Sequence, residues 1–118
     1  MAVQDLTAAF WDYDRTRPLA DGRVGIPCHD LRVVFSAPEA TFARSLSAEF
    51  DISELSFSNS VTRLSQGRLP YVLIPVFLSR AFRHSTIFVR TDRGIVEPAD
   101  LRGKTIGVQE YDMTAAVV

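Results

Sequence analysis

Three polar clusters follow segments of strand-like composition, and they hold the side chains best suited to bind a small ligand. They are Asp12 to Arg17, Glu54 to Asn59, and Glu110 to Tyr111. In an open α/β sheet, ligands bind beyond the carboxyl ends of the strands. A single polar residue after a strand is usually only a solvated loop residue. Because three clusters fall on the same predicted rim, we expect a ligand site there.

The sequence indicates neither a metal nor a nucleotide cofactor. Cys28, His29 and Asp30 are adjacent, whereas metal ligands are usually spaced apart. Gly103 and Gly107 lack the GxGxxG and Walker patterns. The single cysteine excludes an internal disulfide, and we expect it to be a small buried or half-buried thiol. We therefore predict no cofactor and no bound metal.

Composition and charge argue against several other classes of partner. Thirteen basic and fourteen acidic residues among 118 give a net charge of -1, which provides no bulk field toward nucleic acid or anionic lipid. Met1 to Phe10 lacks the basic start and apolar run of an export signal. The longest apolar stretch, Tyr71 to Leu78, is far shorter than the roughly 18 residues of a membrane span. We expect a soluble cytoplasmic protein with no nucleic acid or membrane partner.

Strand and helix patterns alternate along the chain. The segments with strand composition are Leu6 to Trp11, Leu31 to Phe35, Phe50 to Phe57, Tyr71 to Leu78, Thr86 to Val89, and Ile106 to Val108. Helical patterns cover Glu39 to Ala48 and the residues from Asn59 or Ser60 to Gln66. Such alternation predicts an α/β fold with an open, mostly parallel sheet and helices on both faces.

The predicted helices have recognisable ends. Ser36 and Glu39 have the spacing of a capping box. In the second helix we expect Val61 and Leu64 to face inward, and Gly67 supplies a stop.

The segment DLRGKTIGVQEY, Asp100 to Tyr111, divides the chain into two parts. It has the pattern of a loop, a buried strand and the start of a new helix, which predicts a crossover between lobes. We therefore expect a first lobe over residues 1–97, and the crossover with the first strand and helix of a second lobe over 98–118. The helical pattern continues to Val118 without a stop residue, so we expect the second lobe to be truncated.

Four segments together resemble a known family. They are DYDRTRPLADGRV, FDISELSFSNSV, IPVFLSRAFRHSTIFVR and DLRGKTIGVQEYDMTA, and they span almost the whole chain. They are similar to the 4,5-dihydroxyphthalate decarboxylases of phthalate degradation, which look like type II periplasmic substrate-binding proteins in fold. The resemblance implies that this chain is an N-terminal fragment, inactive without the second lobe that completes the cleft.

The implied reaction is the non-oxidative loss of CO2 from 4,5-dihydroxyphthalate to give protocatechuate. Each ring hydroxyl lies para to one carboxylate, so the hydroxyl stabilises the cation formed when the carbon bearing that carboxylate is protonated. The protein must supply a proton donor, a partner for the phenol, and a site that holds one carboxylate. Arginine forks suit such carboxylates because they bind them bidentately.

The resemblance and the loop positions together give the candidate residues. His84 is the candidate proton donor, because a histidine titrates near neutral pH, and a surface histidine is the alternative. Asp14 or Glu54 would accept from the ring hydroxyls or orient an arginine, unless they only form local ion pairs. Candidate substrate-binding residues are Tyr13, Arg15, Arg17, Ser56, Ser58, Asn59, Arg80, Arg83, Glu110 and Tyr111, with helix capping as the alternative for Asn59.

Two other functions share this fold and remain open on the sequence. One is a substrate-binding protein of an ABC-type uptake transporter for a small organic acid, and the other is a degenerate fragment without activity. Fold alone does not separate them from the enzyme. An uncovered apolar sheet edge in half of a two-lobed protein would favour a homo-oligomer.

Overall fold

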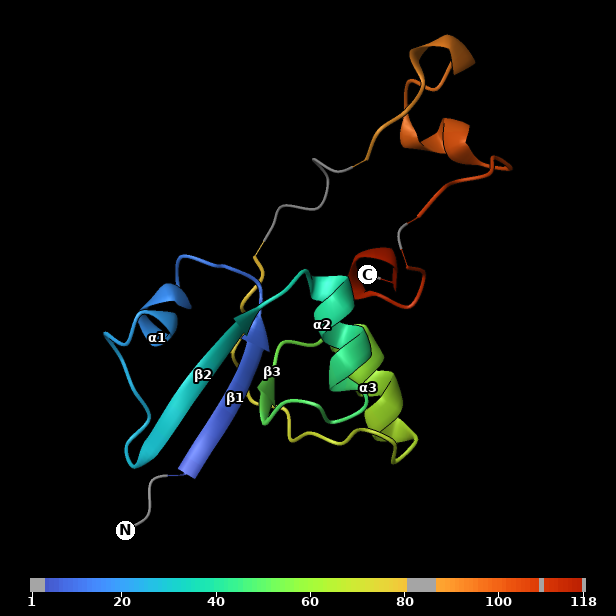
Figure 1. The fold of residues 1–118 in the computed structure, drawn as a ribbon. Helices are drawn as coiled ribbons and strands as arrows, with labels where there is room; N and C mark the ends of the chain where they lie inside the picture. The colour runs from blue at the N-terminus through green and yellow to red at the C-terminus, as the bar shows by residue number, and fades with distance from the viewer. Residues whose placement is uncertain (1–3, 81–86, 109, 118) are drawn as a thin grey trace.

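The computed structural model describes residues 4–80, 87–108 and 110–117, and these residues form an α/β protein (Figure 1). Its sheet is parallel and has the strand order β2-β1-β3, where β1 is Gln4–Phe10, β2 is His29–Phe35 and β3 is Ile52–Ser53. The predicted fold class is therefore confirmed as an open parallel sheet with helices. The first two predicted strands are confirmed within two residues at each end.

The middle strand carries the core. β1 pairs along its whole length with β2, from Gln4 opposite His29 to Phe10 opposite Phe35, and with β3 at Ala8 and Ala9. Ala8, Ala9 and Phe10 are almost fully buried. β1 therefore has a neighbouring strand on each side. The loop that follows β1 borders the end of β3.

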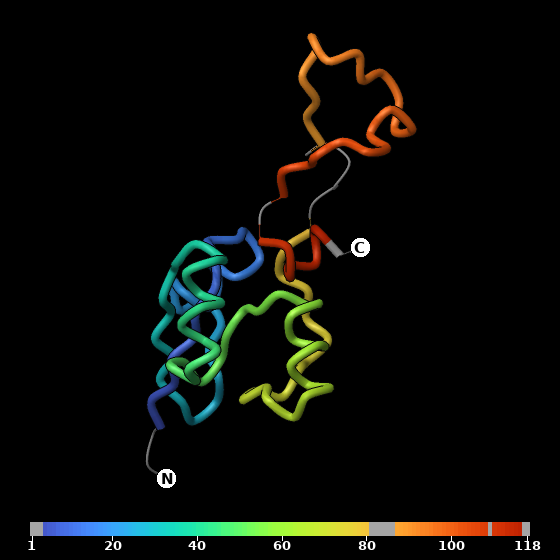
Figure 2. The backbone as a smooth tube through the Cα atoms, turned by 90° about the vertical axis from the view of Figure 1, so that its right-hand side faces the viewer, coloured from blue at the N-terminus to red at the C-terminus, as the bar shows by residue number. Residues whose placement is uncertain are grey.

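Helices connect and flank the strands. α1 (Arg17–Ala20) lies between β1 and β2, and α2 (Pro38–Ser45) lies between β2 and β3 and contacts β1 and β3. α3 (Phe57–Ser65) follows β3 and contacts α4 (Thr114–Val117). Two short 3-10 helices, η2 (Thr91–Arg93) and η3 (Pro98–Leu101), lie in an excursion that leaves the body of the protein before the chain returns to α3 (Figures 1 and 2).

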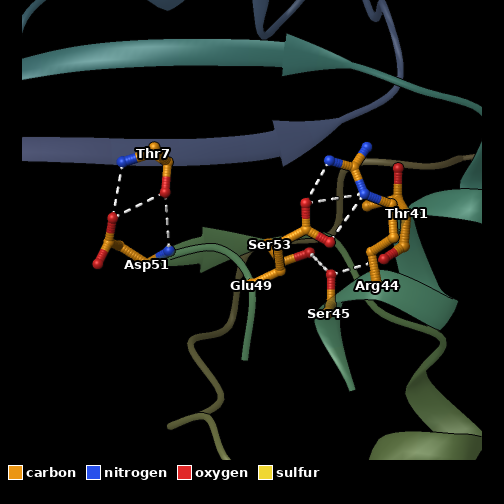
Figure 3. Close-up of polar contacts among 7 residues, drawn as sticks. All are labelled: Thr7, Thr41, Arg44, Ser45, Glu49, Asp51 and Ser53. Atoms are coloured by element: carbon orange, nitrogen blue, oxygen red, sulfur yellow. Dashed lines mark hydrogen bonds and ion pairs between the residues drawn. The ribbon is translucent and has the colours of Figure 1, made fainter. Parts of the chain in front are cut away.

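Polar contacts fix the short strand β3 against α2 (Figure 3). Thr41 and Ser45 of α2 are fully buried, and the Ser45 hydroxyl donates to the Thr41 carbonyl at 2.7 Å. The Ser45 and Ser53 hydroxyls are hydrogen-bonded to each other. Buried hydroxyls of this kind are tolerated because each has a partner. The contact places the carboxyl end of β3 next to α2.

A second contact holds the entry to β3 (Figure 3). One carboxylate oxygen of Asp51 accepts from both the backbone N–H and the hydroxyl of Thr7, each at 2.8 Å. These hydrogen bonds lower the pKa of Asp51. The Asp51 N–H in turn donates to the Thr7 carbonyl at 3.1 Å. β3 is thus aligned with β1 although only two of its residues have strand geometry.

Four of the predicted strands are wrong in extent or existence. Phe50 to Phe57 contributes only Ile52–Ser53, because α3 already begins at Phe57. Tyr71 to Leu78 and Ile106 to Val108 are not strands, and neither are residues 87–89, while Thr86 lies outside the described residues. Val72 is 91% exposed and Ile106 is 59% exposed. An apolar run forms a strand only beside a partner strand, and the described sheet offers these segments none.

The helix ends differ from prediction in two respects. α2 starts after Ala37 with Pro38 in its first turn and no side-chain cap, so the predicted capping box is wrong. Proline's fixed φ suits this position without a cap. α3 starts after Ser56, one turn earlier than predicted, so Asn59 lies inside the helix.

Burial corrects two further expectations. Val61 and Leu64 are 44% and 56% exposed, because the buried side of α3 is formed by Ser60 instead. Cys28 is exposed, since it lies in the turn before β2 with a φ of 62°. Gly67 ends α3 as predicted, with a φ of +64°.

Within the described ranges, no helix has both the length and the apolar character needed to cross a membrane.

Candidate functional site

The ends of β1 and β3 bring two of the predicted clusters together. The Tyr13 hydroxyl donates to Glu54 Oε1 at 2.7 Å, and the Trp11 N–H donates to Glu54 Oε2 at 3.3 Å. The Glu54 N–H donates to the carbonyl of Ala9, the last residue of β1 that pairs with β3. The loop after β1 is therefore joined to the end of β3 at the carboxyl edge of the sheet, where a rim was predicted.

Tyr13 is held as a neutral hydrogen-bond donor. Burial, reinforced by the hydrogen bond to Glu54, raises the pKa of Tyr13 to about 12. The Arg15 guanidinium lies over the Tyr13 ring at 5.6 Å from its centroid and also donates to the Leu78 carbonyl. Tyr13, Arg15 and Glu54 form one group, which we call the rim cluster. It combines a cation, a phenol and a carboxylate.

The other charged residues of the first loop pair locally. Arg17 donates two hydrogen bonds to Asp12, both at 2.9 Å, and this contact lowers the pKa of Asp12. Asp14 accepts from the Arg15 N–H at 2.8 Å and lies 3.5 Å from its guanidinium. The local ion pairs that were the alternative for Asp14 are therefore present.

The second cluster, at the start of α3, contacts the returning C-terminal segment. Ser58 donates from its hydroxyl to the Asp112 carbonyl at 2.7 Å and from its N–H to the Thr114 hydroxyl at 3.1 Å. Asn59 donates from Nδ2 to the Asp112 carboxylate at 2.6 Å. The Ser56 hydroxyl accepts from the Thr114 N–H at 3.3 Å. These contacts join polar groups at the start of α3 to the C-terminal segment.

The remaining predicted residues do not join the rim cluster in the described structure. Glu110 has a φ of 37° and lines a cavity of about 190 Å³ between α2, α3 and the C-terminal segment. Tyr111 is 80% exposed. Arg80 is exposed at the end of a described range, whereas Arg83 and His84 lie outside the described residues. In the part of the chain that the structure describes, no group of three His, Cys, Asp or Glu residues could hold a metal ion.

Sequence reasoning missed four residues around α3. Asp112 and Thr114 contact the start of this helix, and Arg63 and Arg68 line a cavity that extends along it. The sequence did contain a local signal for Arg63. A helix that ends at a glycine commonly folds the residue after that glycine back onto the last turn, and Arg63 lies in that turn. The contact of Asp112 with Asn59 joins residues 53 positions apart and has no local signal.

The fold and the rim cluster define an α/β protein with an open parallel sheet and a polar group at its carboxyl edge. No family model matches the chain. It is 49% identical over 99% of its length to a 4,5-dihydroxyphthalate decarboxylase of Comamonas testosteroni, and 47% identical over 96% to one of Pseudomonas putida. The chain spans 36% and 44% of these two relatives. The resemblance to this family is therefore confirmed over nearly the whole chain.

Proposed function

We propose that this chain forms part of an enzyme that decarboxylates 4,5-dihydroxyphthalate to protocatechuate without an oxidant. The observation that carries the proposal is the 49% identity with a named decarboxylase over 99% of the chain. The second relative has the same name. Because the chain spans less than half of either relative, the complete reaction would need residues from the rest of such a protein.

The candidate residues fit the demands of this reaction. The ring carbon that bears the leaving carboxylate is protonated, and the electron pair of the C–C bond returns to the ring as CO2 departs. We assign the donation of this proton to His84. Arg15, Arg17, Arg80 and Arg83 would hold the carboxylate that stays. The rim cluster supports the role proposed for Arg15, since the Tyr13 ring and the Leu78 carbonyl hold its guanidinium in place.

The rim cluster also supports a role toward the ring hydroxyls. Glu54 already accepts from Tyr13 and from the Trp11 N–H, so it orients the phenol. Tyr13 stays protonated at neutral pH, and because it donates that proton to Glu54, its oxygen is left to accept from a ring hydroxyl. We propose that Tyr13 and Glu54 position the substrate, with Ser56, Ser58, Asn59, Glu110 and Tyr111 as further contacts and Asp14 as an orienting group for Arg15.

The proposal includes the wider architecture. Residues 1–97 would form the first lobe of a type II periplasmic-binding-protein-like fold, and 98–118 would lead into a second lobe. The parallel order β2-β1-β3 and the long excursion before α4 are consistent with this division. The enzyme would act in the cytoplasm on a small aromatic dicarboxylate, without a cofactor.

Turnover by the purified chain and by the Comamonas relative is the first test. Each is incubated with 4,5-dihydroxyphthalate, and protocatechuate and CO2 are measured. We expect turnover by the relative and little or none by the 118-residue chain, which lacks most of the relative's length. Binding without turnover by the relative would contradict the enzyme assignment.

Roles of single residues are tested in a chimera, in which this chain replaces the matching segment of the Comamonas relative. We expect His84→Gln to lower kcat by about a hundredfold or more with little change in KM, because general acid catalysis contributes about 10² to 10⁴. Tyr13→Phe should mainly raise KM. Arg23→Gln, which breaks an exposed ion pair with Asp21, serves as the matched control and should change neither. An unchanged rate in His84→Gln would remove His84 from the mechanism.

A further inference from the structure

The end of α3 places two arginines side by side. The Gly67 N–H donates to the Leu64 carbonyl at 3.0 Å, and the Arg68 N–H donates to the Arg63 carbonyl at 2.9 Å. This pair of hydrogen bonds, with Gly67 at a φ of +64°, is a Schellman motif. The motif turns the chain back on the helix, so Arg68 follows α3 in sequence but returns to the turn that carries Arg63.

Both arginines line one surface cavity of about 220 Å³. Its other lining residues are Asn59, Thr62, Gln66 and Asp112. The ion pairs among the described residues use other arginines, namely Arg15, Arg17, Arg23, Arg44 and Arg90. Arg63 and Arg68 thus form no ion pair within the described structure, although they share a concave surface.

The Arg63 fork is held in a fixed orientation. Its Nε donates to Asn59 Oδ1 at 2.9 Å, and Asn59 Nδ2 donates to the Asp112 carboxylate at 2.6 Å. Because Nε is used, the two terminal nitrogens of this half-buried side chain are the donors left for a ligand. A planar fork that is held in advance loses less entropy on binding a planar anion.

We propose that Arg63 and Arg68 form a binding site for the carboxylate group of a small organic acid. Two guanidinium groups that line one cavity offer N–H donors that match the two oxygens of a carboxylate. Thr62 and Gln66 add neutral hydrogen-bonding groups to the same cavity. Asp112 brings a negative charge to its edge, which favours a singly charged carboxylate over a phosphate dianion. The site needs only residues of this chain and does not depend on decarboxylation.

A simpler role is available for these arginines. Positive charge near the carboxyl end of a helix interacts favourably with the helix dipole, and this interaction would stabilise α3 without any ligand. It predicts an effect on stability and no saturable ligand. The two roles are therefore separable by experiment.

The test is calorimetric titration of the 118-residue chain with benzoate, acetate and inorganic phosphate. We expect saturable binding of the carboxylates, and an affinity lower by about tenfold or more in Arg68→Gln, since a hydrogen bond to a charged group contributes about 1.5–3 kcal/mol. Arg68→Gln leaves the contacts of Arg63 with Asn59 in place. Arg63→Lys, which keeps the charge but loses the fork, should also weaken binding.

Two further variants make the outcome decisive. Asp112→Asn removes the negative charge at the edge and should tighten carboxylate binding. Arg93→Gln changes an exposed arginine of η2 and should leave binding unchanged. Absence of saturable carboxylate binding would overturn the proposal, as would equal weakening by Arg93→Gln or preferential binding of phosphate. A lower melting temperature in Arg68→Gln without any binding would assign these arginines to the helix dipole alone.

Discussion

At the scale of single residues, Tyr13 is the side chain whose properties the structure changes most clearly. Its hydroxyl lies 2.7 Å from Glu54, and its pKa rises from 10.0 to about 12. The folded state therefore favours the protonated phenol. The stability that this group contributes is complete below pH 10 and is lost as the pH rises through about 12.

An alkaline titration followed by phenolate absorbance tests this property. The chain has three tyrosines, and we expect Tyr13→Phe to remove a step near pH 12. Glu54→Gln should move that step to lower pH, because the hydrogen bond and the charge of Glu54 both raise the pKa of Tyr13. Tyr111→Phe, at an exposed position, is the control and should leave the step in place. A late step that persists in Tyr13→Phe would show that another tyrosine produces it.

At the scale of elements, the end of α3 depends on the backbone of Gly67. Its positive φ costs a residue with a Cβ about 1–2 kcal/mol, although no atom within 4 Å would touch that Cβ. We expect Gly67→Ala to reduce the free energy of unfolding by about 1 kcal/mol, measured by urea denaturation.

Gly25→Ala is the matched control for this change. Gly25 also has open space around its Cβ position, but its φ is not in the left-handed region. We expect this variant to unfold within a few tenths of a kcal/mol of the parent protein. Equal losses in both variants would show that the αL conformation at Gly67 is not the cause.

The elements that could be predicted from sequence are those with local signals. β1 was found from its apolar and aromatic residues, β2 from its β-branched and aromatic residues, and the end of α3 from Gly67. The capping box at Ser36 was wrong because Pro38 begins α2 without a side-chain cap. The inward face assigned to Val61 and Leu64 was wrong because helical periodicity does not say which face meets the sheet.

The candidate site was predicted in part for the same reason. The ends of two neighbouring parallel strands had to meet, so Tyr13 and Glu54 could be expected on one rim. The contacts of Ser58 and Asn59 with Asp112 could not, since they depend on how a segment more than 50 residues away returns to α3. Non-local contacts of this kind follow from packing and not from any local pattern.

At the scale of the whole molecule, apolar surface is the dominant feature. Large apolar side chains are exposed in several segments, among them Val72 at 91%, Phe88 at 88% and Ile106 at 59%. Large exposed apolar patches mark association surfaces in soluble proteins. The molecule extends 66 × 33 × 21 Å along its principal axes, which describes an elongated body with an excursion.

We predict that the isolated chain associates with itself through these segments. Sedimentation velocity should show species larger than a monomer that increase with concentration. The double change Val72→Ser and Ile74→Ser should reduce association, because both side chains lie in one exposed stretch. Val24→Ser removes an exposed valine from a different loop and is the control. A monomer at all concentrations would contradict this prediction.

The chimera with the Comamonas relative gives the most direct test of the central claim, that this chain is part of a 4,5-dihydroxyphthalate decarboxylase. The parent chimera is purified, its folding is verified by circular dichroism and thermal melting, and protocatechuate and CO2 are measured together. With 49% identity over the exchanged segment, we predict that the two products form in equal amounts and at a rate within about tenfold of the relative's, a difference of 1.4 kcal/mol in activation free energy. A folded chimera that binds 4,5-dihydroxyphthalate and releases neither product would contradict the claim.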